Sequence, residues 1–138
     1  MKVSEVMSGE CKWCRPDAKV SEAAQMMAQH DFGSLPIAQD DKLVGMITDR
    51  DLVVRGLAKG RDLKNATVQD LITKQVYYCY EDQSCDEVAD NMAELRVRRL
   101  PVVTRDKRLV GIVSLGDLAR KAQSPVAETA LKGVSSRM

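Results

Sequence analysis

Long hydrophobic runs are missing from this sequence, and so is a hydrophobic N-terminal segment. Every apolar stretch is far shorter than the roughly 20 residues that a membrane-spanning helix needs. The N-terminal residues from Met1 to Glu5 include charged side chains and lack the apolar run of a secretory signal peptide. From these two absences we expect a cytoplasmic protein with no membrane contact.

Histidine is almost absent, and charge of one sign does not accumulate anywhere. His30 is the single histidine, so a Ser/His/Asp or Cys/His set for nucleophilic catalysis cannot be assembled convincingly. A Walker loop and a Gly-x-Gly-x-x-Gly turn are both lacking. Basic and acidic residues number 21 and 20, without the clustered basic surplus of a nucleic-acid-binding protein. We therefore expect neither an enzyme nor a nucleic-acid partner.

The four cysteines do not have the spacing of a complete metal site. Disulfides are rare in the reducing cytoplasm. Cys11 and Cys14 have the spacing of half a zinc site or of a redox dithiol. No second pair at that spacing follows, because Cys79 and Cys85 lie six positions apart. Buried thiols are the favoured interpretation, and a metal or redox role for Cys11 and Cys14 is the less favoured one.

An internal repeat is the most informative property of the chain. A shift of 65 positions, as from Asp17 to Asp82, aligns residues of the first half with identical residues of the second, and one extra residue then enters the second copy. Such repetition indicates one structural unit built twice, which predicts a pseudo-symmetric pair with a cleft between its halves. The aligned identities are Asp17/Asp82, Glu22/Glu87, Ala24/Ala89, Met27/Met92, Leu35/Leu100, Pro36/Pro101 and Leu43-Val44-Gly45/Leu109-Val110-Gly111.

Each copy is expected to fold in the order helix, strand, helix, strand, strand, helix. Apolar residues recur at i, i+3, i+4 and i+7 from Val20 and again from Cys85, which predicts two core-facing helices. Two apolar runs joined by polar turn residues follow in each copy and predict a β-hairpin. The expected segments are helical turns at 3–7 and 68–72, extended pieces at 12–15 and 76–80, helices from 20 and 85, hairpins at 35–47 and 100–113, and closing helices from 48 and 114.

Two polar pairs indicate where helices should begin. Thr67 is followed after three residues by Asp70, and Ser84 is followed after three residues by Glu87. This is the spacing of a capping box, in which a hydroxyl and a carboxylate each satisfy a free backbone N–H at the start of a helix. We therefore predict a helix start at each pair.

One motif occurs in both copies after the Leu-Pro pair. Residues 45–51 read Gly-Met-Ile-Thr-Asp-Arg-Asp, and residues 111–117 read Gly-Ile-Val-Ser-Leu-Gly-Asp. Together with the repeated order of helices and strands, these motifs resemble a pair of cystathionine-β-synthase (CBS) domains, also called a Bateman module, of the small stand-alone bacterial kind. The resemblance covers about residues 1–122. It implies an α/β (α+β) fold of two tandem repeats, each a small three-stranded sheet with flanking helices.

The resemblance also implies that an adenine nucleotide or related adenosyl ligand binds in the cleft between the repeats. The motif aspartate would hold the ribose, because a carboxylate can accept two hydrogen bonds at once. The Thr or Ser would lie toward the phosphate, and the glycine would allow close backbone approach. The same Thr/Ser-x-x-Asp pattern also starts ordinary helices, but its occurrence twice favours a ligand site. The residues concerned are Gly45, Thr48 and Asp51 in the first copy and Gly111, Ser114 and Asp117 in the second.

Further candidate ligand contacts flank the motif. Arg98 and Arg99 precede Leu-Pro in the second copy only, and in related modules basic residues at this point reach the phosphates of a ligand. Solvated arginines at the end of a helix are the alternative. Arg50 would contact phosphate or offset its acidic neighbours. By family analogy, the extended pieces that contain Cys14 and Cys79 would contact the base, largely through their backbone.

The function predicted from these residues is regulatory ligand sensing, with AMP, ADP or ATP as the expected ligand and no required cofactor. The family implies a homodimer, and an unidentified effector protein would read the signal. The alternatives are a zinc- or thiol-linked stress-response protein and a dimeric scaffold that binds no small molecule. We assign residues 1–62 to the first repeat, 63–123 to the second and 124–138 to a C-terminal tail, in which 133–138 should fray.

Overall fold

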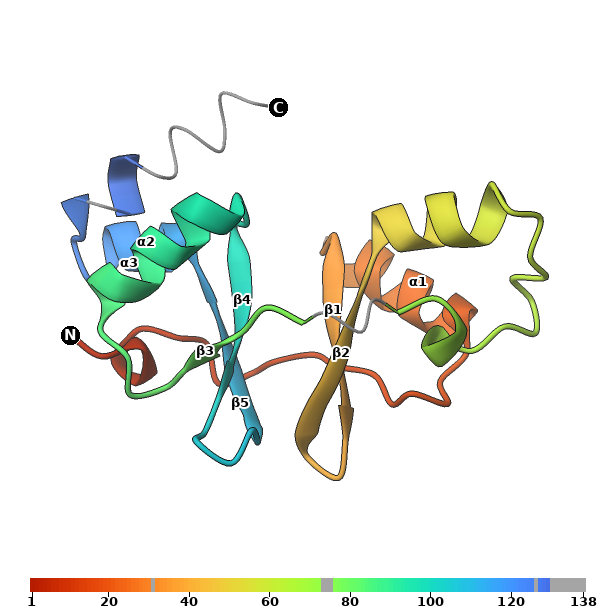
Figure 1. Ribbon diagram of the computed structural model, residues 1–138, viewed down its shortest axis with the longest axis horizontal. Helices are drawn as coiled ribbons and strands as arrows, with labels where there is room; N and C mark the ends of the chain where they lie inside the picture. The colour runs from red at the N-terminus through yellow and green to blue at the C-terminus, as the bar shows by residue number, and fades with distance from the viewer. Residues whose placement is uncertain (31, 73–75, 126, 130–138) are drawn as a thin grey trace. The chain divides into compact units, whose positions relative to one another are not determined.

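The chain folds into two compact units that do not follow the order of the sequence (Figure 1). The computed structural model describes residues 1–30, 32–72, 76–125 and 127–129. Unit 1 combines Met1–Cys11 with the chain from Tyr77 onward, and unit 2 is Lys12–Val76. None of the helices within the described ranges is long and apolar enough to cross a membrane.

Unit 2 is built on an antiparallel hairpin with helical segments around it. Its elements are α1 (Val20–His30), β1 (Ser34–Gln39), β2 (Lys42–Thr48), η2 (Asp51–Leu57) and η3 (Val68–Asp70). Asp40 and Asp41 form the turn between β1 and β2 with φ of 51° and 66°, which aspartate tolerates better than most residues. Cys14 adds a parallel bridge to β1 at Ile37. This single bridge takes the place of the extended piece expected at 12–15.

Unit 1 contains a three-stranded sheet in the order β3-β4-β5. Its elements are η1 (Val3–Glu5), β3 (Cys79–Tyr80), α2 (Cys85–Leu95), β4 (Arg99–Val103), β5 (Leu109–Ser114) and α3 (Leu115–Arg120). β3 runs parallel to β4, and β4 pairs with β5 in antiparallel fashion. In Figure 1, α2 and α3 pack side by side next to the β4–β5 hairpin. The predicted class of two small sheets with flanking helices is thus confirmed, but a three-stranded sheet is found in unit 1 and a two-stranded one in unit 2. The piece expected at 76–80 narrows to a strand of two residues.

The two short helical turns are exchanged between the copies: η1, at the start of the first copy, packs in unit 1 with the second copy, and η3, at the start of the second copy, packs in unit 2 with the first. In unit 1, Val3 N–H donates to Gln83 O at 2.9 Å, and Ser8 exchanges two backbone hydrogen bonds with Ile112 of β5. In unit 2, Val68 N–H donates to Ala18 O at 2.9 Å. The helical turn of each copy therefore completes the unit of the other copy. The repeat boundaries given above remain a prediction.

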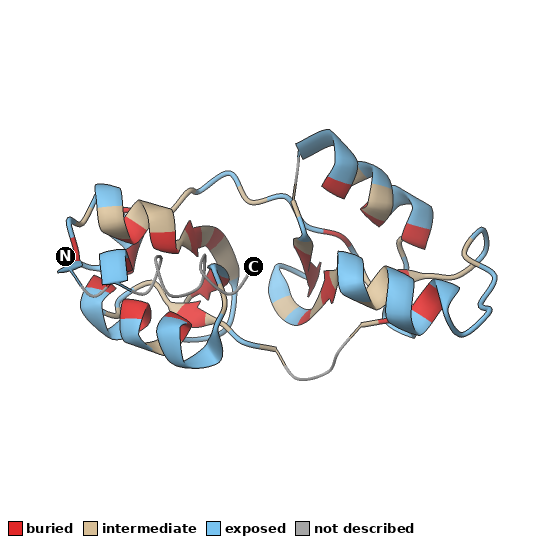
Figure 2. Cartoon of the chain, turned by 90° about the horizontal axis from the view of Figure 1, so that it is seen from above, coloured by how far each residue is buried: buried red, intermediate tan, exposed pale blue. Residues whose placement is uncertain are grey.

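Each unit has a core of its own (Figure 2). In α2 all four predicted core residues are buried, whereas in α1 Ala24 is only half-buried and the other three are buried. Fully burying one Leu or Ile side chain contributes about 1.5–3 kcal/mol. The core residues of unit 1 include Val3, Val6, Cys79, Val88, Met92, Leu100, Val102, Val113, Leu115 and Leu118, and those of unit 2 include Cys14, Val20, Met27, Leu35, Ile37, Ile47, Val68 and Leu71.

The predicted helix starts are confirmed with one difference in detail. Thr67 and Asp70 form a reciprocal capping box at η3. Ser84 Oγ accepts from Glu87 N–H at 3.2 Å and so caps α2, while the Glu87 carboxylate accepts from Gln83 Nε2 at 2.8 Å. The glutamine side chain reaches this carboxylate from the preceding turn. The expected frayed segment 133–138 lies outside the described residues.

The closing helix of the first copy has an unexpected form. η2 is wound as a π-helix, in which Ala58 N–H donates to Val53 O, five residues back, at 2.8 Å. π-Helical turns are rare and occur frequently at functional sites. The corresponding α3 of unit 1 is an ordinary α-helix. The two copies therefore differ in the segment that follows the repeated motif.

Candidate functional site

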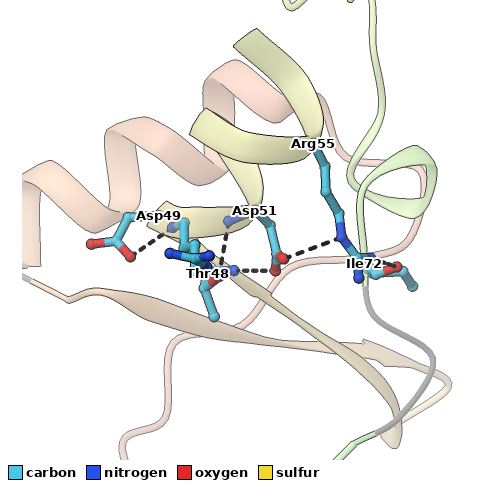
Figure 3. Close-up of polar contacts among 6 residues, drawn as sticks. Thr48, Asp49, Asp51, Arg55 and Ile72 are labelled. Atoms are coloured by element: carbon cyan, nitrogen blue, oxygen red, sulfur yellow. Dashed lines mark hydrogen bonds and ion pairs between the residues drawn. The ribbon is translucent and has the colours of Figure 1, made fainter. Parts of the chain in front are cut away.

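The repeated motif forms the turn from the second hairpin strand into the following helix. In unit 2, Thr48 ends β2, and its N–H donates to Asp51 Oδ2 at 2.9 Å (Figure 3). Asp51 N–H donates back to Thr48 Oγ1 at 3.0 Å. These two bonds satisfy backbone N–H groups that the start of a helix leaves without partners. They also fix the orientation of the Asp51 carboxylate.

The same arrangement occurs in unit 1. Ser114 ends β5, its N–H donates to Asp117 Oδ2 at 3.2 Å, and Asp117 N–H donates to Ser114 Oγ at 3.0 Å. The side chains of Asp51 and Asp117 are 13% and 18% exposed, respectively. Each carboxylate thus uses Oδ2 for the cap and keeps Oδ1 for contacts with side chains.

A cation four residues after each motif aspartate approaches this second oxygen. Arg55 Nε lies 3.7 Å from Asp51 Oδ1 (Figure 3), and Lys121 Nζ lies 3.6 Å from Asp117 Oδ1. Arg120 Nη2 lies 3.8 Å from the same Asp117 oxygen. Sequence reasoning missed these cations, although acid–base pairs at i, i+4 on a helix are a readable signal.

Both motif glycines lie in the middle of a strand. Gly45 pairs with Ile37, and Gly111 pairs with Val102. The closest neighbours of Gly111 belong to the segment after η1, and the closest neighbour of Gly45 is the side chain of Ile72, after η3. The close approach at each glycine is therefore made by the chain itself, and its role toward a ligand stays a prediction.

The structure brings the predicted arginines of the second copy to the start of α3. Arg98 O accepts from Leu115 N–H at 2.9 Å, and Arg99 pairs with Ser114 across the hairpin. Both side chains are exposed. Arg50 is also exposed, and its N–H donates to Asp49 Oδ1 at 2.8 Å. All three candidate arginines therefore lie beside a motif turn.

The two equivalent cysteines occupy buried positions beside a hairpin. Cys14 N–H donates to Pro36 O at 3.0 Å, and Cys14 O accepts from Ala38 N–H at 2.9 Å. Cys79 pairs with Val102 in β4. Both residues lie along a strand, away from the strand ends that carry the motif turns. Their contact with a base, proposed by family analogy, stays a prediction.

Burial keeps the thiols protonated, and therefore poor nucleophiles, at neutral pH. It raises the pKa of Cys79 to about 12 and that of Cys11 to about 11. The pKa of Cys14 is raised by burial and, to a smaller extent, by the charge of Glu22. The thiolate is the form that binds metals and attacks electrophiles. The described residues contain no group of three or more His, Cys, Asp or Glu side chains placed to hold a metal ion.

Comparison with known proteins identifies the family. The CBS domain profile matches residues 3–57 and 68–124. The chain belongs to the CBS domain family. Hypoxic response protein 1 of Mycobacterium tuberculosis (strain H37Rv) is 42% identical over 120 residues, which cover 86% of this chain and 83% of that protein.

Solved structures of CBS proteins resemble this chain over most of its length. Hypoxic Response Protein I with two coordinated zinc ions matches with a TM-score of 0.78 and 40% identity, covering 87% of this chain and 98% of that chain. The CBS pair of protein MJ0100 with 5-methylthioadenosine and S-adenosyl-L-methionine has a TM-score of 0.73 at 30% identity, with coverage of 89% and 96%. CBSX2 in complex with AMP has a TM-score of 0.76 at 26% identity, with coverage of 88% and 96%.

Proposed function

We propose that this CBS pair is a regulatory module that binds an adenine nucleotide or another adenosyl ligand and is not an enzyme. The observation that carries the proposal is the repeated turn in which Thr48 with Asp51, and Ser114 with Asp117, form the same reciprocal hydrogen bonds. Two CBS proteins of similar structure have been solved with AMP or with S-adenosyl-L-methionine and 5-methylthioadenosine. The likeness supports an adenosyl ligand for this chain.

In this proposal the motif residues bind the sugar and the phosphate. Asp51 and Asp117 accept hydrogen bonds from the two ribose hydroxyls through carboxylates that the caps already orient, which lowers the entropy lost on binding. Arg98, Arg99 and Arg50 contact the phosphates, because a guanidinium donates two parallel hydrogen bonds to phosphate oxygens.

The output of the module passes through a second copy of the chain and an effector protein. Ligand binding shifts the population of two arrangements only to the extent that it prefers one of them. η2 offers an apolar surface for a homodimer, because Val53, Val54 and Leu57 are 55%, 39% and 66% exposed. A second chain would remove this surface from water, and the effector would read the resulting state.

A thermal-shift panel of AMP, ADP, ATP, NAD and S-adenosylmethionine tests the proposal. A ligand present at 100 times its dissociation constant should add about 2.7 kcal/mol to the free energy of unfolding. The variant Asp117→Asn, which keeps an oxygen for the cap, should lose most of the shift, and Asp51→Asn should do so for the other copy. Unchanged melting temperatures across the panel would favour the non-binding scaffold.

Asp70→Asn provides the matched control for these variants. Asp70 forms the same kind of capping box, with Thr67 N–H at 3.0 Å from its Oδ2. It lies outside the repeated motif. Asp70→Asn should therefore change stability slightly and leave the ligand-induced shift intact. An equal loss of the shift in all three variants would show that folding, and not ligand contact, explains the effect.

A zinc-linked function is the second candidate, because the similar structure of Hypoxic Response Protein I holds two coordinated zinc ions. Cys11 and Cys14 are the candidate ligands here, with a spacing that suits half a zinc site. Metal analysis of protein purified without chelator should then find stoichiometric zinc that Cys14→Ser removes and Cys85→Ser retains. Protein free of zinc would exclude this function.

A further inference from the structure

The cation that follows each motif aspartate also donates a hydrogen bond to a backbone carbonyl group just after the short helical turn of the same unit. This turn, η1 in unit 1 and η3 in unit 2, is called the exchanged helical turn. Lys121 Nζ donates to Val6 O at 3.3 Å while it lies 3.6 Å from Asp117 Oδ1. Arg55 Nη1 donates to Ile72 O at 3.3 Å while its Nε lies 3.7 Å from Asp51 Oδ1 (Figure 3). Each side chain thus connects the carboxylate to a segment distant in sequence.

This connection is repeated with different chemistry in the two units. One unit uses a lysine and the other an arginine, on helices of different type. Val6 directly follows η1, and Ile72 lies just beyond η3, so the two carbonyls occupy similar places. The two units differ in the cationic side chain, but in both of them this side chain links the motif carboxylate to the helical turn.

We propose that Lys121 and Arg55 are positioning residues that couple the state of the motif aspartate to the seating of the exchanged helical turn. This inference rests on the proposed function in one respect, because the ligand is taken to contact Asp117 and Asp51. When ribose hydroxyls occupy the carboxylate, the cation loses one of its two partners. Its hold on the helical turn then weakens, and the turn becomes the element that reports ligand occupancy.

The helical turn is suited to this role by its attachment. In unit 1 it is tied to β5 by the bonds between Ser8 and Ile112, at 2.9 and 3.0 Å, two residues before the capping Ser114. Val6 itself is buried in the core of unit 1. A loosened Lys121 therefore acts on a segment that is both part of the core and paired with the strand that leads to the site.

Hydrogen exchange of the full chain without ligand tests the coupling directly. Lys121→Met should speed exchange of the Ser8 amide about threefold, the effect expected from loss of one partly exposed polar contact. Asp117→Asn should act in the same direction, and the double variant should not exceed the larger single effect, because both remove one link. The Val88 amide of α2, which donates to Ser84 O, is the internal reference.

Arg120→Met is the matched control. Arg120 lies near the same Asp117 oxygen, at 3.8 Å, so the substitution removes a comparable positive charge from the neighbourhood of this carboxylate. It should leave Ser8 exchange unchanged. Equal exchange in Lys121→Met and the wild type, or equal acceleration in Arg120→Met, would overturn the proposal.

Adding AMP separates this inference from the proposed function. In the wild type, saturating AMP should raise the melting temperature and speed Ser8 exchange relative to Val88, and in Lys121→Met it should raise the melting temperature without changing Ser8 exchange. AMP binding with the same effect on Ser8 in both proteins would overturn the coupling. If AMP does not raise the melting temperature, AMP sensing fails, and the ligand-free exchange still decides whether the coupling exists.

Discussion

Gly111 lies directly against the backbone of Ser8. A methyl group on Gly111 would stand 2.5 Å from Ser8 O and 2.9 Å from Met7 Sδ. The carbonyl cannot retreat easily, because Ser8 is paired with Ile112 on the same strand. The equivalent methyl group on Gly45 would meet Ile72 Cδ1, the end of a flexible side chain, at 2.9 Å. The two glycines are equivalent in sequence but differ in what surrounds them.

We predict that Gly111→Ala destabilises the protein more than Gly45→Ala. A clash with backbone must shift the exchanged segment, and overpacking of this kind costs about 1–3 kcal/mol. At Gly45 a rotation of the Ile72 side chain relieves the clash, so the cost should stay below about 1 kcal/mol. Urea unfolding of both variants measures the difference. Equal losses would mean that the Ser8 segment yields as readily as a side chain.

The sequence repeat predicted the elements of this fold well, because each rests on local patterns. Val88 and Met92 in α2 and Val20 and Met27 in α1 follow the helical period, and both hairpins lie where apolar runs flank polar turns. Periodicity records that a helical turn has an apolar face, but not which unit buries it. The sequence therefore did not predict that η1 and η3 pack in the unit of the other copy, and it did not predict the π-helical winding of η2.

The candidate site was predictable in its repeated part only. For the Thr/Ser-x-x-Asp pattern, capping at Thr48 and Ser114 was the alternative to a ligand contact, and the caps are found there because their geometry depends on spacing along the chain. The contacts of Arg55 and Lys121 depend on carbonyl groups 17 and 115 positions away. Such contacts become visible only when the packing of the helical turns is known.

The ion pair between Asp82 and Arg105 gives a prediction for acid pH. Arg105 donates to Asp82 through Nη2 at 2.8 Å and Nε at 3.0 Å, and this hydrogen-bonded guanidinium lowers the pKa of Asp82 below its ordinary value of 3.8. A lowered pKa in the folded state stabilises the protein above about pH 4. That contribution is lost as the pH falls through the folded pKa.

NMR titration of the Asp82 carboxyl measures this effect. Arg105→Gln should bring the Asp82 pKa back toward 3.8, because the bidentate donor is gone. Arg108→Gln is the control, since Arg108 belongs to the same turn but pairs with Asp106, at 3.9 Å. If Arg108→Gln shifts the pKa as much as Arg105→Gln, the cause is the general charge of the turn and not the hydrogen-bonded pair.

The buried thiol of Cys79 gives a prediction for alkaline pH. Burial raises its pKa from 9.0 to about 12, and the nearby Cys85 adds to the shift. Between these two pH values the thiol loses its proton in the unfolded chain and keeps it in the folded chain. The contribution of this thiol to the free energy of unfolding is therefore fully present below about pH 9 and is lost as the pH rises. The slope for this thiol approaches about 1.4 kcal/mol per pH unit.

Chemical denaturation at several pH values from 8 to 11 checks this slope. Cys79→Ala removes the titrating group and should flatten the decline, at some cost in packing. In the wild type, alkylation of Cys79 by iodoacetamide at pH 8 should be slow and should become fast in denaturant, since the thiolate is the reactive form. A decline of equal steepness in Cys79→Ala would assign the alkaline loss to other groups.

Ser124 connects the segment after α3 to the start of α2, and its removal gives the last prediction. Ser124 is 2% exposed, and its Oγ donates to Asp86 Oδ1 at 2.7 Å and accepts from Ala127 N–H at 3.2 Å. Ser124→Ala leaves a buried N–H without this partner, so we expect a loss of about 1–2 kcal/mol in the free energy of unfolding. Thr129→Ala, which removes an exposed hydroxyl bonded to Pro125 O, should change stability by less than about 0.5 kcal/mol. Equal effects of both variants in urea unfolding would show that the Ser124 contact does not hold the C-terminal segment in place.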